Sequence, residues 1–245
     1  MNGSQLDLTR RDIVKSLGAG AVAVAAALPS SAGAATAAKS PRYGMVIDTR
    51  RCSGCHACSV ACKSEFNVPL GLTRSWVEYI EKGDFPNVSV SFLPRLCNQC
   101  RHAACADVCP TGATYKRQDG IVAIDPDICI GCKYCLQACP YDARFINPVT
   151  GAADKCDFCL HRIEKGIEPS CVNTCPGRAR IFGDLNDPGS EISKVISRNP
   201  VTVLRKGMGT EPFVFYIAAD HADEHDRKRG WNMRVTTHRR QKERR

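Results

Sequence analysis

Sixteen cysteines in a chain of 245 residues constrain its fold more than any other feature of the sequence. They fall into four groups of four, with none left over. The groups are Cys52, Cys55, Cys58 and Cys62 (motif I), Cys97, Cys100, Cys105 and Cys109 (motif II), Cys129, Cys132, Cys135 and Cys139 (motif III), and Cys156, Cys159, Cys171 and Cys175 (motif IV). Aromatic residues make up only 7% of the chain, so aromatic packing does not explain its architecture. The sequence therefore indicates that something is bound to the thiols.

The spacing of the motifs reveals an internal repeat. Motifs I and III read C-x2-C-x2-C-x3-C, motif II reads C-x2-C-x4-C-x3-C and motif IV reads C-x2-C-x11-C-x3-C. Proline follows the last cysteine in motifs II, III and IV, whereas Lys63 stands there in motif I. Motifs I and III also match outside their cysteines at an offset of 77 residues, where Gly54 corresponds to Gly131. Such self-similarity at a fixed offset is typical of a repeated structural unit.

Three interpretations of the thiols compete. An even number of cysteines in an exported chain is typical of a disulfide framework, but pairing within C-x2-C gives strained and easily reduced bridges. Structural zinc uses pairs of C-x2-C knuckles, but it does not need three cysteines in seven residues followed by Cys-Pro. The run C-x2-C-x2-C-x3-C-P is the bacterial ferredoxin pattern, in which three cysteines hold one iron–sulfur cube and the fourth reaches another. Because iron prefers thiolate ligands, the sequence favours four 4Fe-4S clusters on sixteen ligands.

The net charge agrees with this interpretation. The chain carries a formal charge of +9, which by itself would suggest a nucleic-acid or membrane-surface partner. Each oxidised cluster with its four thiolates carries roughly −2, so four clusters contribute about −8. The basic excess is then compensation for buried anionic clusters, and we expect no nucleic-acid partner.

Residues 1–34 are predicted to be an export signal. Arg10 and Arg11 are followed by an uncharged stretch from Ser16 to Leu28 and then by small residues. This apolar stretch is shorter than the roughly 20 residues that span a bilayer, and it is rich in alanine and glycine. The segment resembles the twin-arginine signal, with Ile13 and Val14 at positions where phenylalanine and leucine are usual. We expect export of an already folded protein that acquires its cofactors in the reducing cytoplasm.

The segments between the motifs predict an α+β fold of two pseudo-symmetric bacterial-ferredoxin-like modules with short helices and β-hairpins. Residues 97–147, with an Asp-Gly turn between two short strands, form the second module (motifs II and III). Residues 42–96 and 148–185 form the first (motifs I and IV), and the insertion 66–96 carries a strand pair with a packing residue, Trp76.

The rest of the chain extends these modules. Residues 186–219 form a C-terminal helix and strand segment, in which Asp187 is expected to cap a helix that Pro188 opens. Residues 201–204 and 212–218 are expected to be strands, and residues 220–245 a charged tail that is mobile or ordered by a partner.

No catalytic site is predicted. The sequence shows no phosphate-binding glycine loop, nucleophile elbow or paired carboxylates. His56, His102 and His161 lie in or beside the cysteine motifs, where they can donate to a cluster sulfur; the simpler interpretation is that they are packing or surface residues. Iron–sulfur clusters without a substrate site point to electron transfer.

The order of the motifs, with the long gap inside motif IV, resembles the four-cluster electron-transfer subunit of the dimethyl sulfoxide reductase family of molybdenum enzymes. The resemblance covers residues 42–218 and extends beyond the ligands at residues 97–113 and 180–187. It is most similar to the tetrathionate, thiosulfate and polysulfide reductase branch. Some relatives have tryptophan at the second position of motif III and hold a 3Fe-4S cluster, but Cys132 is intact here, so four cubanes are expected.

The resemblance implies that the fourth cysteine of each motif is exchanged within the pairs I/IV and II/III. Spacing alone leaves the pairing of I with II and III with IV equally open. The implied ligand sets are Cys52, Cys55, Cys58 and Cys175 (cluster 1); Cys62, Cys156, Cys159 and Cys171 (cluster 2); Cys97, Cys100, Cys105 and Cys139 (cluster 3); and Cys109, Cys129, Cys132 and Cys135 (cluster 4).

The resemblance also implies the partners. They are a catalytic subunit with a molybdenum or tungsten pterin cofactor, and a membrane subunit that exchanges electrons with quinone. The chain itself would be a non-catalytic, peripheral subunit on the periplasmic or extracytoplasmic side, with no transmembrane helix in its mature part, serving anaerobic respiration on a sulfur compound. Two alternatives remain: a relay that feeds a periplasmic cytochrome nitrite reductase, and a metal-stabilised structural protein without a redox role.

Overall fold

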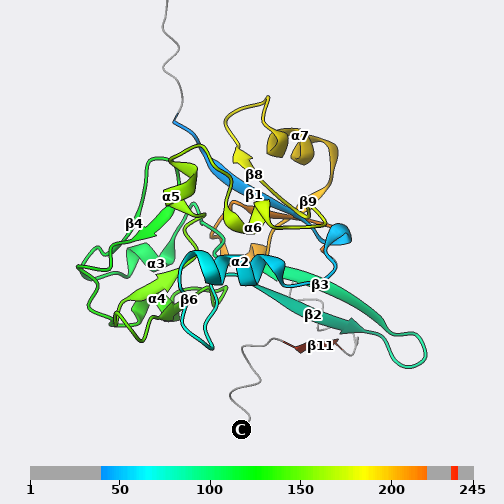
Figure 1. Cartoon of the computed structure of the whole chain (residues 1–245), viewed down its shortest axis with the longest axis horizontal. Helices are drawn as coiled ribbons and strands as arrows, with labels where there is room; N and C mark the ends of the chain where they lie inside the picture. The colour runs from blue at the N-terminus through cyan, green and yellow to red at the C-terminus, as the bar shows by residue number, and fades with distance from the viewer. Residues whose placement is uncertain (1–39, 220–232, 237–245) are drawn as a thin grey trace, which may run out of the picture. The chain divides into compact units, whose positions relative to one another are not determined.

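The computed structural model describes residues 40–219 and 233–236 (Figure 1). All sixteen cysteines lie in this part of the chain, and none of them forms a disulfide. The predicted export signal, residues 1–34, lies outside the described residues. The fold is the expected mixture of short helices and small sheets.

Short elements dominate the described residues. The strands are β1 (Tyr43–Asp48), β2 (Trp76–Lys82), β3 (Ser89–Arg95), β4 (Thr114–Lys116), β5 (Val122–Ile124), β6 (Arg144–Ile146), β7 (Ala153–Lys155), β8 (Arg180–Asp184), β9 (Val201–Thr202), β10 (Val214–Ile217) and β11 (Met233–Thr236). The helices are α2 (Ala57–Glu65), α3 (Ala104–Asp107), α4 (Tyr134–Gln137), α5 (Leu160–Ile163), α6 (Ser170–Asn173) and α7 (Glu191–Arg198), with 3-10 turns η1 (Thr49–Arg51) and η2 (Lys206–Met208).

The residue after the fourth cysteine of each motif explains the lengths of the helices. Helices α3, α4 and α6 have four residues each and end two residues before the fourth cysteine. A proline then follows, and proline can neither donate a helical hydrogen bond nor leave its predecessor in helical conformation easily. In motif I Lys63 replaces this proline, and α2 continues for nine residues.

Both predicted hairpins are present. Strands β4 and β5 pair antiparallel across the Asp-Gly turn, with Thr114 opposite Ile124. Strands β2 and β3 pair over their whole length, and their hairpin projects from the cluster of short helices (Figure 1). Trp76, at the base of this hairpin, is buried, as expected for a packing residue. A third hairpin, β6–β7, joins motif III to motif IV across the predicted boundary at residues 147 and 148.

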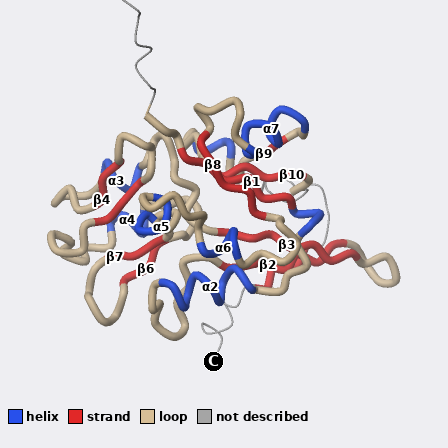
Figure 2. Tube along the Cα trace, turned by 45° about the horizontal axis from the view of Figure 1, so that its top comes forward, coloured by secondary structure: helices blue, strands red, loops and turns tan. Residues whose placement is uncertain are grey.

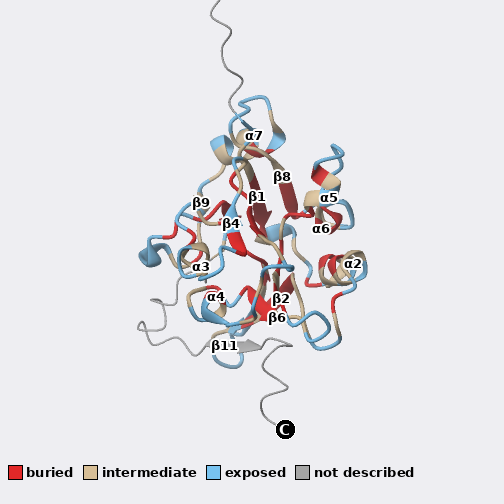
Figure 3. Ribbon diagram, turned by 90° about the vertical axis from the view of Figure 1, so that its left-hand side faces the viewer, coloured by how far each residue is buried: buried red, intermediate tan, exposed pale blue. Residues whose placement is uncertain are grey.

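A four-stranded sheet has the order β8-β1-β10-β9. It pairs the first described strand, β1, with strands from the C-terminal part of the chain. Strand β1 runs antiparallel to β8 and parallel to β10, a pairing that needs a long crossover connection and leaves no local sequence signal. Helix α7 lies against β8 and β1 (Figure 2). Val46, Ile181, Ile192 and Ile217 form an apolar core between this helix and the sheet. Figure 3 shows that β1 is buried along most of its length.

Two expectations for the C-terminal part were wrong in detail. Helix α7 begins at Glu191, and its cap is Ser190, whose hydroxyl accepts from the amide of Ser193 at 3.3 Å. Asp187 instead accepts from the amide of Gly189, in a turn that precedes the helix. Serine and aspartate are both favoured N-cap residues, and the one directly before Glu191 is used.

The predicted tail, residues 220–245, contains a strand. Strand β11 (Met233–Thr236) pairs antiparallel with the free edge of β2, so the expectation of a wholly mobile or partner-ordered tail was wrong for these residues. An unpaired strand edge offers backbone groups to any extended segment, whatever its composition. Residues 220–232 and 237–245 lie outside the described residues.

Candidate iron–sulfur site

The first two cysteines of every motif enclose the same turn. The residue before the second cysteine has a left-handed conformation in all four motifs: φ is 71° at Gly54, 47° at Gln99, 66° at Gly131 and 59° at Phe158. Glycine adopts this conformation without steric cost, whereas glutamine and phenylalanine do so at about 1–2 kcal/mol. The turn is therefore imposed by the motif geometry even where the sequence opposes it.

The third cysteine is the second residue of a short helix in every motif. Cys58, Cys105, Cys135 and Cys171 occupy this position in α2, α3, α4 and α6, respectively. Helix α2 packs against α6, and α3 packs against α4 (Figure 2). These contacts place motif I beside motif IV and motif II beside motif III.

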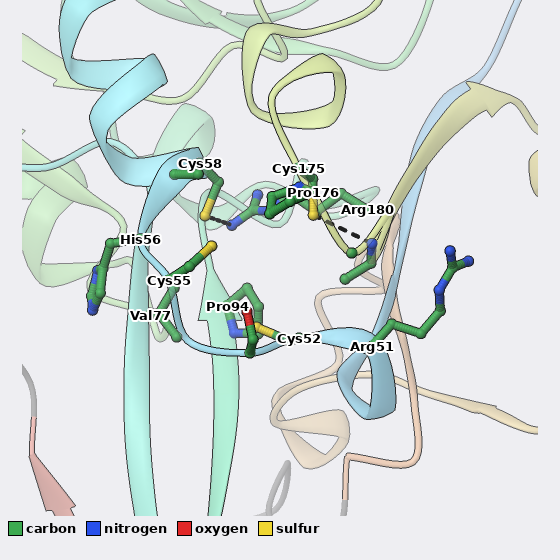
Figure 4. Close-up of a pocket in the computed structure, with 14 residues that line it drawn as sticks. Arg51, Cys52, Cys55, His56, Cys58, Val77, Pro94, Cys175, Pro176 and Arg180 are labelled. Carbon is green, nitrogen blue, oxygen red and sulfur yellow. Dashed lines mark hydrogen bonds between the residues drawn. The ribbon is translucent and has the colours of Figure 1, made fainter.

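Two cavities are each lined by four cysteines. The first holds the three leading cysteines of motif I together with the last cysteine of motif IV, and Figure 4 shows them around a common space: Cys52, Cys55, Cys58 and Cys175. The second holds the last cysteine of motif II together with the three leading cysteines of motif III: Cys109, Cys129, Cys132 and Cys135. The structure thus brings together the groupings expected for clusters 1 and 4.

The other eight cysteines form two further neighbourhoods. Burial, together with the nearby Cys171 and Cys159, raises the pKa of the Cys62 thiol to about 12. All four cysteines of the predicted second set are buried.

In the predicted third set, burial raises the pKa values of three thiols, those of Cys100, Cys105 and Cys139. Burial raises the pKa of Cys100 to about 12, with the charges of Cys97, Cys105 and Cys139 adding to the effect. Adjacent buried thiols resist ionisation because their thiolates are poorly solvated and repel one another. Bound iron would offset this free-energy cost, because its positive charge neutralises the thiolates.

Backbone amides point at the cysteine sulfurs. The bonds run from Ala179 N to Cys175 Sγ at 3.3 Å, from Ala153 N to Cys129 Sγ at 3.4 Å, and from Thr114 N to Cys109 Sγ at 3.4 Å. Hydrogen bonds of this kind stabilise thiolate ligands and tune an iron–sulfur cluster.

Two buried arginines also approach the sulfurs. Arg144 and Arg180 each begin the strand after a Cys-Pro-x-x-Ala segment, and they are only 3% and 2% exposed. Desolvation lowers the pKa of Arg180, but neighbouring thiolates outweigh it and hold that pKa above its ordinary value, so the side chain stays charged. These two arginines were not among the site residues predicted from the sequence, although the repeated Cys-Pro-x-x-Ala-Arg pattern identifies both.

Gln99 connects the two halves of the site. Its side chain is fully buried, donates to the carbonyl of Cys156 at 2.8 Å and accepts from the amide of Val122 at 2.8 Å. It therefore ties the loop of motif II to the loop of motif IV.

The three histidines near the motifs form other contacts. His56 lies 2.9 Å from the hydroxyl of Tyr79, and His161 lies 2.7 Å from Glu65. His102 is exposed and lies 3.5 Å from Glu211. These contacts agree with the packing and surface roles expected for them.

The donor set fits 4Fe-4S clusters. Four sulfurs line each cavity, amides donate to sulfurs, and buried cations offset the negative charge that such clusters carry. When bound, a cluster supplies one-electron redox chemistry. The residues of the protein hold the cluster, shield it from water and set its potential.

Comparison with known proteins agrees with this geometry. The family of 4Fe-4S dicluster domains matches residues 88–185. The B subunit of tetrathionate reductase of Salmonella typhimurium is 44% identical over 230 residues, which cover 90% of this chain and 92% of that protein. The chain belongs to the family of iron–sulfur B subunits of dimethyl sulfoxide reductase-type complexes.

Other members of the family are equally similar over a shorter stretch. The B subunit of polysulfide reductase of Wolinella succinogenes is 43% identical over 179 residues, covering 72% of this chain and 94% of that protein. Protein NrfC of Escherichia coli is 46% identical over 179 residues, covering 72% of this chain and 80% of that protein. As a member of this family, the protein is an iron–sulfur electron-transfer subunit that binds 4Fe-4S clusters.

Motif I lies outside the matched dicluster domain, which contains the other twelve cysteines. Within the described residues, no helix has the length and apolar character needed to cross a membrane.

Proposed function

We propose that this protein carries four 4Fe-4S clusters and relays electrons between a quinone-linked membrane subunit and a molybdopterin catalytic subunit. The grouping of cysteines from motifs I with IV and II with III around shared cavities carries the proposal. The protein itself has a non-catalytic role. The substrate class that we propose is a sulfur compound such as tetrathionate, thiosulfate or polysulfide, which the names of two relatives support.

The four ligand sets are part of this proposal. They are Cys52, Cys55, Cys58 and Cys175 for cluster 1; Cys62, Cys156, Cys159 and Cys171 for cluster 2; Cys97, Cys100, Cys105 and Cys139 for cluster 3; and Cys109, Cys129, Cys132 and Cys135 for cluster 4.

Exposure suggests an order for the relay. Cys55 of cluster 1 and Cys132 of cluster 4 are exposed, whereas every ligand of cluster 2 is buried. The ligands of cluster 2 lie beside those of cluster 1 because α2 packs on α6. They lie beside those of cluster 3 because Gln99 donates a hydrogen bond to the carbonyl of Cys156. Clusters held by the first and fourth ligand sets would therefore be the ends of the relay, and bound clusters would supply one-electron transfer between neighbouring sites.

Isolation of the protein from its native membrane fraction under anaerobic conditions tests the proposal. We expect a large molybdopterin protein and an integral membrane protein to co-purify, with about sixteen iron and sixteen acid-labile sulfide per chain from four cubanes. Co-purification of a multihaem cytochrome in place of the molybdopterin protein would favour the nitrite reductase alternative. Zinc without sulfide would establish a structural metal protein and overturn the relay.

We also propose export by the twin-arginine route to the extracytoplasmic face of the membrane. Replacing Arg10 and Arg11 by lysine should leave the protein in the cytoplasm with its clusters intact, because the substitution changes the signal alone. Cell fractionation followed by immunoblotting measures the location. Lysine at the consecutive pair Arg244 and Arg245 is the matched control and should leave export unchanged. Equal export of both variants would contradict the proposed route.

A further inference from the structure

We propose that Arg180 and Arg144 are positioning residues, each of which sets the reduction potentials of two neighbouring clusters. The inference rests on the proposed ligand sets. In each half of the molecule one buried guanidinium contacts sulfurs that belong to two different sets. The two arginines therefore act on separate cluster pairs, Arg180 on clusters 1 and 2 and Arg144 on clusters 3 and 4.

Arg180 lies between the first two sets. Its Nη2 is 3.5 Å from Cys58 Sγ, a ligand of cluster 1, and its Nη1 is 3.7 Å from Cys171 Sγ, a ligand of cluster 2. Nη2 also donates to the hydroxyl of Ser75 at 2.9 Å, which orients the guanidinium plane. Figure 4 shows the guanidinium reaching the sulfur of Cys58 at the edge of the first cavity.

Arg144 repeats this arrangement in the other half. Its Nη2 lies 2.9 Å from Cys105 Sγ, a ligand of cluster 3, and Cys135, a ligand of cluster 4, is near enough to raise the pKa of the Arg144 guanidinium. Its Nη1 donates to the hydroxyl of Thr114 at 3.1 Å, as Arg180 donates to Ser75. Each arginine thus donates a hydrogen bond to one hydroxyl group and lies close to sulfurs from two ligand sets.

The charge of each arginine explains the expected effect. Reduction adds one negative charge to a cluster, so a fixed positive charge at hydrogen-bonding distance favours the reduced form and raises the potential. Burial strengthens this effect because solvent does not screen the charge. Hydrogen bonds to the ligand sulfurs act in the same direction.

Reductive titration followed by electron paramagnetic resonance, on the full-length protein, tests the inference. We expect Arg180→Met to lower the midpoint potentials of two clusters and Arg144→Met to lower those of the other two. Each shift should correspond to at least a tenfold change in the reduction equilibrium, or about 59 mV for a one-electron couple. Each variant is the control for the other. A general loss of protein stability would not shift the potentials of clusters 1 and 2 in one variant and those of clusters 3 and 4 in the other.

Conservative variants keep the test decisive if a methionine variant fails to hold its clusters. Arg180→Lys and Arg144→Lys retain the charge but replace the planar fork by one ammonium group, so a smaller shift confined to the same pair is expected. Iron and sulfide contents are measured in every variant. A full cluster content with four unmoved potentials, or with all four potentials moved equally by either arginine, would overturn this inference alone. A wild-type protein without clusters would overturn the proposed function itself.

Discussion

Replacing Cys132 by tryptophan should convert one 4Fe-4S cluster into a 3Fe-4S cluster and leave three cubanes intact. Cys132 is the second cysteine of motif III, lines the cavity with three other cysteines and is exposed, so an indole can occupy its place at the surface. Without this thiolate, one iron atom lacks a protein ligand and is lost. Electron paramagnetic resonance of the oxidised variant should show a new three-iron signal, and iron should fall by about one atom per chain.

The neighbouring Ile130 provides the matched control. It lines the same cavity and is 68% exposed, but it supplies no sulfur. Tryptophan at position 130 adds the same bulk and should leave all four cubanes in place. If Cys132→Trp keeps its full iron content and shows no three-iron signal, Cys132 is not a cluster ligand.

Removal of iron should unfold the half of the molecule that contains motifs II and III before the four-stranded sheet. Helices α3 and α4 have four residues each, far fewer than the roughly 12–15 that make an isolated helix even marginally stable in water. Strands β4 to β7 have three residues each. These short elements surround the cysteine thiols. Cluster binding to the thiols therefore contributes directly to the free energy of their folding.

Hydrogen exchange measured by mass spectrometry after anaerobic chelation follows this unfolding. Residues 97–155 should lose protection first, by at least tenfold in exchange rate. Strands β1, β8 and β10 should stay protected longer, because α7 covers an apolar core on this sheet. A chelator already saturated with iron is the control. Equal loss of protection in both regions would show that the sheet also depends on the clusters.

Local patterns predicted the parts of the structure whose causes lie within a few residues. The Asp-Gly turn predicted the β4–β5 hairpin, and the alternation of apolar and polar side chains predicted the β2–β3 hairpin. Helices α2, α3, α4 and α6 each start one residue before a third cysteine, and they end according to the presence or absence of proline. The predicted start of α7 was wrong because aspartate and serine side chains can both accept a hydrogen bond at a helix N-terminus. Only the folded structure shows that Ser190, and not Asp187, caps the helix.

Pairing over long distances could not be predicted in this way. Strand β1 had no recognised signal, and its parallel partner β10 lies about 170 residues later in the sequence. The contacts of Arg180 with sulfurs of motifs I and IV likewise depend on packing between segments up to 122 residues apart.

The sequence by itself determined the chemistry of this protein: sixteen thiols in four motifs, three of them closed by proline, specify short loops and helices that offer sulfur to iron. Only the tertiary structure decided which motifs share a cavity and which cations lie between them. The physical reason is that ligand type and local turns depend on neighbouring residues. The grouping of ligands depends instead on helix packing and on the burial of charge between distant segments.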